Sequence, residues 1–215
     1  MAELVTIVLA SSNEGKLAEL RSLLAELPVQ LVTLKDLLGE HPTLPEDGNT
    51  FEANAVQKAR AAYQLTGLPA LADDSGLEVT GLQGRPGVRS ARFSHERATD
   101  AENNAALLRE LEAVDDEGRV ARFRCVLALV VPGVEQPLTV EGCVSGSIAR
   151  DSRGGGGFGY DPLFVVDGFE GRAMAELGDA EKNQVSHRGQ AARAMKPLIA
   201  QLLSNQLDEA ERIAG

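Results

Sequence analysis

The sequence predicts a single α/β domain in which helices flank a mixed sheet. Strand and helix patterns alternate from Val5 to Val79, as in chains that connect strands through helices. A strand hairpin then dominates the middle of the chain, and hairpin strands pair antiparallel, so we expect the sheet to be mixed. With 215 residues and 43% hydrophobic content, the chain suffices for one sizeable core. We expect one domain over residues 1–203 and a polar C-terminal tail over residues 204–215.

The first elements are a strand, a helix and a second strand. Val5–Ala10 is a short β-branched and apolar run that ends in a polar turn. Leucines at helical spacing follow it and predict the helix: Leu17, Leu20, Leu23, Leu24 and Leu27. Pro28 stops this helix, and a second short strand is expected near Val29–Thr33.

A loop and a second helix come next. Leu38–Gly48 contains two prolines, two glycines and several carboxylates, which is typical of a loop. Thr50 is the expected N-cap of a helix that reaches about Leu65, where Gly67 and a proline end it. Ala70–Val79 then has the pattern of a strand, a loop and a strand, with the loop at its acidic middle.

The second half of the chain contains the remaining elements. A T-x-x-E capping box at Thr99 and Glu102 begins a helix that ends near Leu111. Two hairpin strands, an extended segment and a last helix with a serine cap are expected at Arg122–Val131, Leu138–Val144, Pro162–Val166 and Ser186–Leu203.

The charge and the hydropathy of the chain exclude several function classes. A formal net charge of −11 opposes a nucleic-acid partner, because binding to a phosphate backbone normally requires a basic surface. A small phosphorylated ligand is compatible with this charge, since it needs only a few local cations and can bring a metal. No apolar run approaches the ~20 residues of a membrane span, and the N-terminus does not resemble a signal peptide. We expect a cytoplasmic protein without a membrane partner.

Cys125 and Cys143 are the two cysteines of the chain. They have no CxxC spacing and no nearby histidine that would indicate a metal site. Their mirror positions about Val134 in the hairpin would allow a disulfide. We favour two free, partly buried thiols, because the expected cytosolic compartment is reducing.

The first candidate site is the polar run between the first strand and the first helix. It consists of Ser11, Ser12, Asn13, Glu14, Gly15 and Lys16. Backbone N–H groups at a helix N-terminus, a hydroxyl and a lysine ammonium together favour an anion. The P-loop spacing is absent, and a merely capped strand-to-helix turn is the alternative.

The second candidate site is the acidic run Asp73-Asp74-Ser75-Gly76. Adjacent carboxylates repel each other unless a cation or hydrogen-bond donors offset the charge, which indicates a site for a hard metal. Glu46, in the acidic loop, is a candidate for a further oxygen ligand. An aspartate-rich turn without a metal is the alternative.

The third candidate site is the glycine-rich run from Arg153 to Asp161. Four successive glycines allow a backbone to come close to a planar ligand. Phe158 and Tyr160, on either side of Gly159, are candidates for a stacking face. A flexible loop is the alternative.

The fourth candidate site lies at the start of the last helix. His187 and Arg188 occupy its first turn, close after Lys182, although the helix dipole disfavours cations there. Either a negatively charged ligand or a nearby carboxylate would account for them.

These pieces, in this order, resemble the inosine/xanthosine triphosphate pyrophosphatase family. The resemblance runs from about Val5 to Met195. The motifs that carry it are S-x-N-x-x-K at Ser11, T-F-x-x-N-A at Thr50, ADDSGLEV at Ala72, G-x-P-G-V-x-S-A-R at Gly84, GGFGYDPLF at Gly156 and EKN-x-x-SHRG at Glu181. Each motif is weak to moderate by itself, but the ordered set is specific.

The resemblance implies a two-lobed α/β fold with a long central mixed sheet, a cleft between the lobes, and a homodimer. It implies Mg²⁺-dependent hydrolysis of non-canonical purine nucleoside triphosphates (ITP, dITP and XTP) to the monophosphate and pyrophosphate. Asn13 and Lys16 would be the principal triphosphate contacts of Ser11–Lys16. Asp74 would be the catalytic carboxylate and a metal ligand, with Glu46 as the second ligand. Ser75 would contact the substrate, and the base and sugar pocket would consist of Phe158, Gly159, Tyr160, Asp161, Lys182, His187 and Arg188.

One position departs from the family pattern. The family commonly has a glutamate where this chain has Ala53, and here Glu52 lies one place earlier. We therefore leave Glu52 out of the predicted site. Two rival functions stay open: a sensor that binds a nucleotide without hydrolysing it, and a related pyrophosphatase that acts on modified pyrimidine or standard nucleotides.

Overall fold

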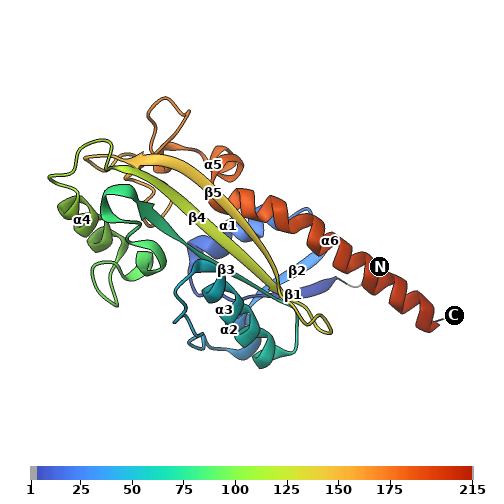
Figure 1. Cartoon of the computed structure of the whole chain (residues 1–215). Coiled ribbons are helices and arrows are strands. Elements are labelled where there is room, and N and C mark those ends of the chain that lie inside the picture. The colour runs from blue at the N-terminus through green and yellow to red at the C-terminus, as the bar shows by residue number, and fades with distance from the viewer. Residues whose placement is uncertain (1–3, 215) are drawn as a thin grey trace.

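The chain folds around one six-stranded sheet with the strand order β2-β1-β3-β4-β5-β6 (Figure 1). The computed structural model describes residues 4–214, and only the backbone from residue 205 onward. β1 pairs parallel with β2 and β3, and the other pairs are antiparallel. The predicted α/β class with a mixed sheet is therefore confirmed. The strands are β1 Val5–Leu9, β2 Val29–Thr33, β3 Ala70–Val79, β4 Val120–Val130, β5 Leu138–Ile148 and β6 Phe164–Val166.

Helices cover both faces of the sheet near β1. The helices are α1 Glu14–Leu24, α2 Leu34–Leu38, α3 Phe51–Thr66, α4 Asp100–Glu110, α5 Asp179–Val185 and α6 His187–Ala214. On one face, α1 and α6 pack their apolar side chains against Leu71, Cys125 and Leu127. On the other face, the alanines of α3 pack against Ala70, Ala72 and Val126. Figure 1 shows α3 on the opposite side of the strands from α6.

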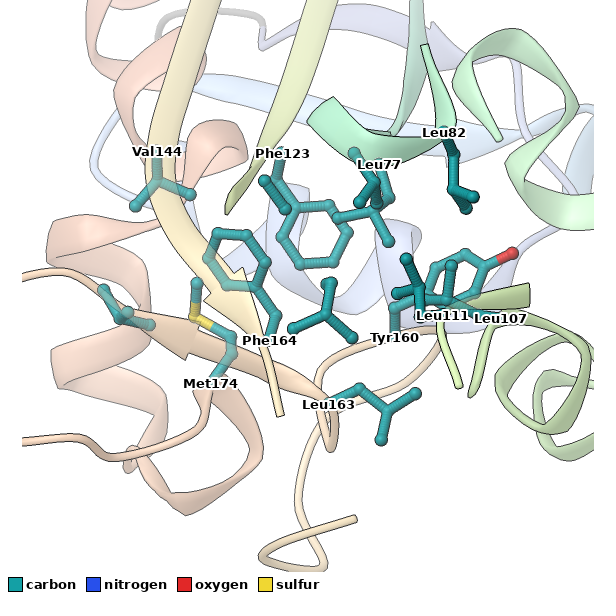
Figure 2. Close-up of a cluster of buried hydrophobic side chains, with 14 of the residues drawn as sticks. Leu77, Leu82, Leu107, Leu111, Phe123, Val144, Tyr160, Leu163, Phe164 and Met174 are labelled. Atoms are coloured by element: carbon teal, nitrogen blue, oxygen red, sulfur yellow. The ribbon is translucent and has the colours of Figure 1, made fainter. Parts of the chain in front are cut away.

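A third hydrophobic cluster lies at the far end of the long strands. It joins Leu77 and Phe123 of the sheet to α4 and β6, and the rings of Phe123 and Phe164 are 4.6 Å apart at its centre (Figure 2). We call the part around β1, β2, α1, α3 and α6 the first lobe, and the part around this third cluster the second lobe. β3, β4 and β5 run through both lobes.

Local signals predict several elements correctly. Thr50 caps α3, because its hydroxyl oxygen accepts the Ala53 N–H, and Thr99 forms the predicted capping box with Glu102. The hairpin turn lies between Val130 and Leu138. Both cysteines are free. Cys125 lies opposite Gly142, and Cys143 opposite Arg124, so the cysteines are offset by one residue and point to opposite sheet faces.

The prediction of a loop within Ala70–Val79 is wrong. β3 is one continuous strand, paired with β4 from Ala70 opposite Val130 to Val79 opposite Ala121. This pairing keeps the acidic run extended. Because successive side chains of a strand point to opposite faces, Asp73 faces α1 and α6, whereas Asp74 faces α3.

Two additional helices and one helix end also differ from the predictions. The short helices α2 and α5 lie in segments for which no helix was predicted, and α6 continues to Ala214, past the predicted end at Leu203. The added segment contains glutamine, leucine, alanine, glutamate and arginine, which favour a helix although they are mostly polar. The division of the chain at residue 203 stays a prediction. Among the described residues, no helix has the length and apolar character needed to cross a membrane.

Candidate active site

The larger of two adjoining cavities opens where β1 ends. β1 pairs with β3 only as far as Leu9 and Leu71, so β3 continues beyond the carboxyl end of β1. Ligands of open α/β sheets commonly bind at this kind of edge. The cavity has a volume of about 560 Å³. Its lining includes the turn after β1, Lys16 of α1, Glu46, Lys58 of α3 and Asp73.

The turn after β1 is built as a helix cap. Asn13 is the N-cap of α1, and its Oδ1 accepts the Lys16 N–H at 3.0 Å. Ser11 accepts the Asn13 N–H and lines the larger cavity together with the exposed Ser12. Glu14 and Gly15, which belong to the same predicted site, line neither cavity.

Gly15 has a packing role in this turn. A Cβ atom at Gly15 would lie 2.6 Å from a ring carbon of Phe158. No larger residue would allow the ring to lie where it does. The glycine thereby brings the glycine-rich run of the second lobe into contact with the first turn of α1.

Asp73 is fully buried and paired with two cations. Its Oδ1 lies 2.6 Å from Lys16 Nζ, and its Oδ2 lies 2.7 Å from Arg188 Nε. Burial opposes its ionisation, but the charges of Arg188 and Lys16 outweigh burial and hold the pKa of Asp73 well below its usual range. Ser75 donates to Asp73 and accepts from Arg188 Nη2. Asp73 is thus an anchor for Lys16, Ser75 and Arg188.

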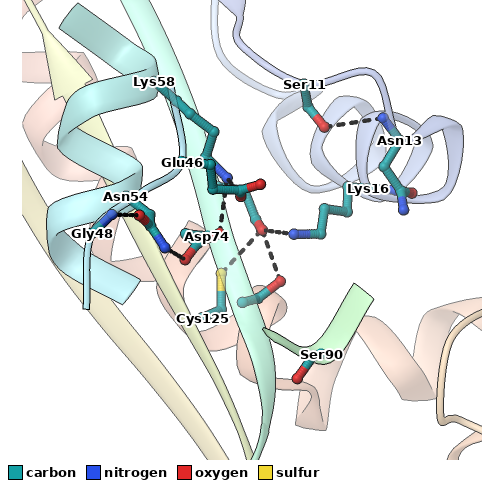
Figure 3. A network of polar contacts seen from close by, with 12 residues as sticks. Ser11, Asn13, Lys16, Glu46, Gly48, Asn54, Lys58, Asp74, Ser90 and Cys125 are labelled. Atoms are coloured by element: carbon teal, nitrogen blue, oxygen red, sulfur yellow. Dashed lines mark hydrogen bonds and ion pairs between the residues drawn. The ribbon is translucent and has the colours of Figure 1, made fainter. Parts of the chain in front are cut away.

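Asp74 lies on the other face of β3 and is not among the residues that line the larger cavity, although its partner Lys58 is. Lys58 Nζ is 2.8 Å from Asp74 Oδ1 and also pairs with Glu46 (Figure 3). Burial raises the pKa of Asp74 to about 6, against the opposing charge of Lys58. Burial also opposes ionisation of Glu46, but Lys58 and a hydrogen bond with Asp74 lower the pKa of Glu46 to about 2. The two carboxylates therefore differ in how readily they hold a proton.

The smaller cavity, of about 90 Å³, lies between the lobes and is lined by every residue predicted for the base and sugar pocket, whereas residues 153–157 of the third predicted site do not line it. It is lined by Ser75, Phe158, Gly159, Tyr160, Asp161, Lys182, His187 and Arg188, among others. Asn13, Lys16 and Ala91 line both cavities, so the cavities adjoin. The structure thus brings the four sequence motifs together around one site.

Two buried cations lie beneath the ring of Phe158. Lys182 Nζ is 4.8 Å and Arg188 Cζ is 5.5 Å from the ring centroid. Lys182 also pairs with Asp161 at 2.6 Å. The Phe158 and Gly159 N–H groups donate to Asp161 and Asp100. These two N–H groups are therefore satisfied, and the cations are the main donors of the pocket.

His187 is buried and stacked on Phe123, with ring centroids 4.7 Å apart and planes within 12°. Burial, together with the charge of Arg188, holds the pKa of His187 well below its usual range. The imidazole is therefore neutral near pH 7. Its Nδ1 is buried without a hydrogen-bond partner among the described residues, which is costly unless a ligand satisfies it.

Known proteins match this chain over most of its length. Residues 7–198 match the model of the Ham1 family. The chain belongs to the Ham1 family. A dITP/XTP pyrophosphatase of Geobacter sulfurreducens is 52% identical over 190 residues, which are 88% of this chain and 94% of the relative. One of Bacillus licheniformis is 46% identical over 195 residues, which are 91% of this chain and 98% of the relative.

Solved Ham1 family structures share the fold. A HAM1 protein of Coxiella burnetii has a TM-score of 0.83 at 45% identity, covering 92% of this chain and 100% of that one. The Ham1 protein of Staphylococcus aureus has a TM-score of 0.80 at 35% identity, covering 91% and 98%. The family resemblance inferred from the ordered motifs is confirmed.

Sequence reasoning missed several charged or polar side chains of this Ham1 site, three of which contact its buried charged groups. Lys58 lies between the carboxylates of Glu46 and Asp74, and Asn54 donates to Asp74. Glu19 of α1 bridges Lys182 and Arg188. Asn54 and Lys58 are four residues apart, on the alanine-rich face of α3, so their burial was readable from helical spacing. Glu19 gives no such signal.

Glu52, which the sequence analysis leaves out of the predicted site, lies away from both cavities. Glu52 is exposed and accepts a hydrogen bond from Thr139 of β5 at 3.3 Å. It lines a surface groove on the sheet and neither of the two cavities of the site. No carboxylate of α3 therefore approaches Asp74.

The donor set of the Ham1 site fits a magnesium ion. Within the part of the chain whose side chains are described, no group of three or more His, Cys, Asp or Glu side chains is placed to hold a metal. Mg²⁺ in phosphate-transfer sites uses only one or two carboxylates and takes its other ligands from phosphates and water. Glu46 and Asp74 supply two carboxylates, and the ammonium of Lys58 lies between them. A cation is therefore already favoured at this position.

Proposed function

We propose that this Ham1 family protein hydrolyses ITP, dITP and XTP to the nucleoside monophosphate and pyrophosphate. One observation carries the proposal: a carboxylate-lined cavity and a cation-lined pocket adjoin at Asn13, Lys16 and Ala91. The first suits a metal-bound triphosphate, and the second suits a base with carbonyl oxygens. The names of the relatives, dITP/XTP pyrophosphatase, support the same substrate class.

We propose that Glu46 and Asp74 hold the magnesium ion. When bound, Mg²⁺ neutralises phosphate charge and lowers the pKa of a coordinated water. Asp74, with its pKa of about 6, is poised to accept a proton near neutral pH. The water oxygen forms a bond to the attacked phosphorus, the bond between that phosphorus and the oxygen that bridges the α- and β-phosphorus breaks, and the water proton passes to Asp74. Attack on the α- or the β-phosphorus yields the same two products.

The other side chains have positioning and charge roles in this proposal. Lys16, at the N-terminus of α1, places a point charge on the triphosphate. Ser75 contacts the substrate from β3, while the base stacks on Phe158. Lys182 and Arg188 donate to the base, and His187 offers its unpaired Nδ1.

The function is tested by product analysis of the purified full chain. Incubation with ITP and Mg²⁺ should release IMP and pyrophosphate in equal amounts, and EDTA should abolish the release. Tight ITP binding without product would instead identify a nucleotide sensor. Release of inorganic phosphate and IDP would contradict the assignment of the cleaved bond.

Replacing Lys16 by alanine is expected to raise KM for ITP and lower kcat together. The charge acts on the triphosphate in both ground and transition states. Loss of one charge-assisted hydrogen bond predicts a drop in kcat/KM of roughly 10- to 100-fold. The measurement is steady-state kinetics with ITP. Lys196→Ala is the control, because Lys196 pairs with Glu26 on the outer surface. If Lys16→Ala changed the melting temperature but not the kinetics, the turn would have a structural role and no role in substrate binding.

We propose a homodimer that forms through the open face of β3, β4 and β5. Charges of both signs alternate there, because Arg124 pairs with Glu78 and Glu141. Val120 is half exposed beside them. Such a face is complementary to a second copy of itself. Sedimentation at micromolar concentration should give twice the chain mass of 22.8 kDa, and Arg124→Glu should weaken the dimer. A wild-type mass of one chain would refute it.

We also propose that the reaction takes place in the cytosol. Nucleoside triphosphates are abundant there, and the reducing milieu suits the free thiols of Cys125 and Cys143.

A further inference from the structure

Asn54 connects two chain segments that the proposed metal site requires. Its side chain is fully buried on α3. Its Nδ2 donates to Asp74 Oδ2 at 3.1 Å, and its Oδ1 accepts the Gly48 N–H at 2.7 Å. Gly48 lies two residues after Glu46, at the end of the acidic loop of residues 39–49. Figure 3 shows this chain of contacts running from Gly48 through Asn54 to Asp74.

Glu46 also has a hydrogen bond with Asp74, which a metal between the two carboxylates would replace. The loop has two further polar attachments near Glu46. Lys58 pairs with the Glu46 carboxylate, and Arg92 contacts both its carboxylate and its carbonyl oxygen. The pair with Lys58 occupies the position between the two proposed metal ligands, so it must rearrange when a metal binds. Arg92 is partly exposed, and its contacts are long, at 3.3 to 3.5 Å. The contacts of Lys58 and Arg92 with Glu46 therefore hold the loop less firmly than the hydrogen bond between Asn54 and Gly48 does.

The hydrogen bonds of Asn54 leave the ligand position open. Asn54 uses Asp74 Oδ2, whereas Lys58 uses Oδ1. On the loop it binds a backbone N–H, which is not a metal ligand. Both bonds can therefore persist when the cation between Glu46 and Asp74 changes.

We propose that Asn54 is a positioning residue that holds Glu46 at a fixed separation from Asp74 and thereby sets the magnesium requirement of the enzyme. The proposal rests on the proposed metal site. Asn54 does not touch the substrate or the metal. Residues that orient metal ligands in this way typically change metal affinity by roughly 10- to 100-fold when replaced.

Asn54→Ala tests the proposal with two readouts. In the metal-free protein, hydrogen exchange of the Gly48 amide, followed by NMR, should accelerate because its acceptor is gone. In the enzyme assay, the Mg²⁺ concentration for half-maximal rate should rise roughly tenfold. KM for ITP at saturating Mg²⁺ should change by less than about twofold, since Asn54 makes no substrate contact.

Gly48→Ala tests the same connection from the loop. A Cβ atom at Gly48 would lie 2.8 Å from both Asn54 Oδ1 and Ala53 Cβ, so it would push the loop away from α3. The same rise in the Mg²⁺ requirement is expected. This variant keeps Asn54 and serves if Asn54→Ala fails to fold, which circular dichroism would show.

Thr50→Ala is the matched control. It removes the N-cap of α3 and destabilises the same helix, but it removes no hydrogen bond of Asp74 or of Gly48. Its Mg²⁺ requirement should be that of the wild type. The proposal is overturned if Thr50→Ala raises the requirement as much as Asn54→Ala does, or if both Asn54→Ala and Gly48→Ala leave it unchanged. A wild-type enzyme that needs no Mg²⁺ would instead refute the proposed metal site, and Gly48 exchange would still report the hydrogen bond.

Discussion

ITP and XTP are expected to be hydrolysed with kcat/KM values up to roughly 10⁴-fold above that of ATP. Hypoxanthine and xanthine carry a carbonyl oxygen at the purine 6-position, whereas adenine carries an amino group. The pocket offers the buried cations Lys182 and Arg188, which are donors only. Adenine would leave these donors without an acceptor and place its own N–H groups against positive charge. Sites that require a hydrogen bond reject analogues that lack it by this order of magnitude.

The contribution of Arg188 to this selectivity is smaller than the sequence suggests. Its Nε, Nη1 and Nη2 already donate to Asp73, Glu19 and Ser75. A guanidinium has five N–H groups, so two remain for a base. Together with the remaining N–H of Lys182, they provide a small, fixed set of donors.

The measurement is a panel of kcat/KM values for ITP, XTP, GTP, ATP and dUTP with Mg²⁺. GTP shares the 6-carbonyl and differs from ITP by its 2-amino group, so we expect a low value that exceeds the value for ATP. Comparable values for ITP and ATP would refute selection at the 6-position. A preference for dUTP would identify a pyrimidine nucleotide hydrolase.

Asp74→Asn is expected to lower kcat by at least ~100-fold, the low end of general-base effects. The amide neither accepts a proton at neutral pH nor supplies a negatively charged metal ligand. Glu52→Gln is the matched control, because Glu52 lies at the start of α3 and faces Thr139. Single-turnover kinetics with ITP separate the chemical step from binding. Near-normal turnover in a folded variant would remove Asp74 from the mechanism.

The fold of this variant should survive. The pKa of Asp74 in the folded protein is about 6, above its ordinary value of 3.8. The folded state therefore binds this proton more tightly than the unfolded state, so the stability contribution of Asp74 decreases as pH rises from about 4 to 6. At pH 7 the buried carboxylate opposes folding. The neutral amide removes this penalty, and buried Lys58 keeps its pair with Glu46, so the melting temperature should not fall.

The same pKa predicts a pH profile. At limiting Mg²⁺, the rate of the wild type should fall as pH falls through about 6, because Asp74 becomes protonated. Added Mg²⁺ competes with the proton and should move this limb to lower pH. If the pH at which the rate falls did not change with the Mg²⁺ concentration, the titrating group would not belong to the metal site.

Short-range signals account for the parts of the fold that the sequence predicts well. The Thr50 cap, the Thr99 capping box and the hairpin turn each depend on residues within a few positions of one another. The continuity of β3 does not depend on such nearby residues. Locally, Asp73 to Gly76 resembles a turn, and only pairing with β4, about 50 positions later in the chain, keeps it extended.

The same distinction applies to the site. The four motifs were readable because each is contiguous in the sequence. The partner of each buried charge could not be predicted, because the partners are far apart in the sequence. Arg188 lies 115 positions from Asp73 and 169 positions from Glu19. For the cations in the first turn of α6, the sequence allowed either a negatively charged ligand or a nearby carboxylate as the partner. The structure shows carboxylates beside Arg188. The magnesium ligands and the roles of the site residues stay predictions.

The three long strands have a mechanical consequence for substrate entry. Hydrogen bonds of the β3–β4 and β4–β5 ladders continue without a break through both lobes, so a hinge rotation between the lobes would rupture many of them at once. The smaller cavity, at about 90 Å³, is nevertheless below the ~300 Å³ of common ligand pockets. The sheet is therefore the stiff part of the molecule, and side chains such as Phe158 are the compliant part. Small-angle scattering should give the same radius of gyration with and without nucleotide, while the NMR signals of the Phe158 ring shift.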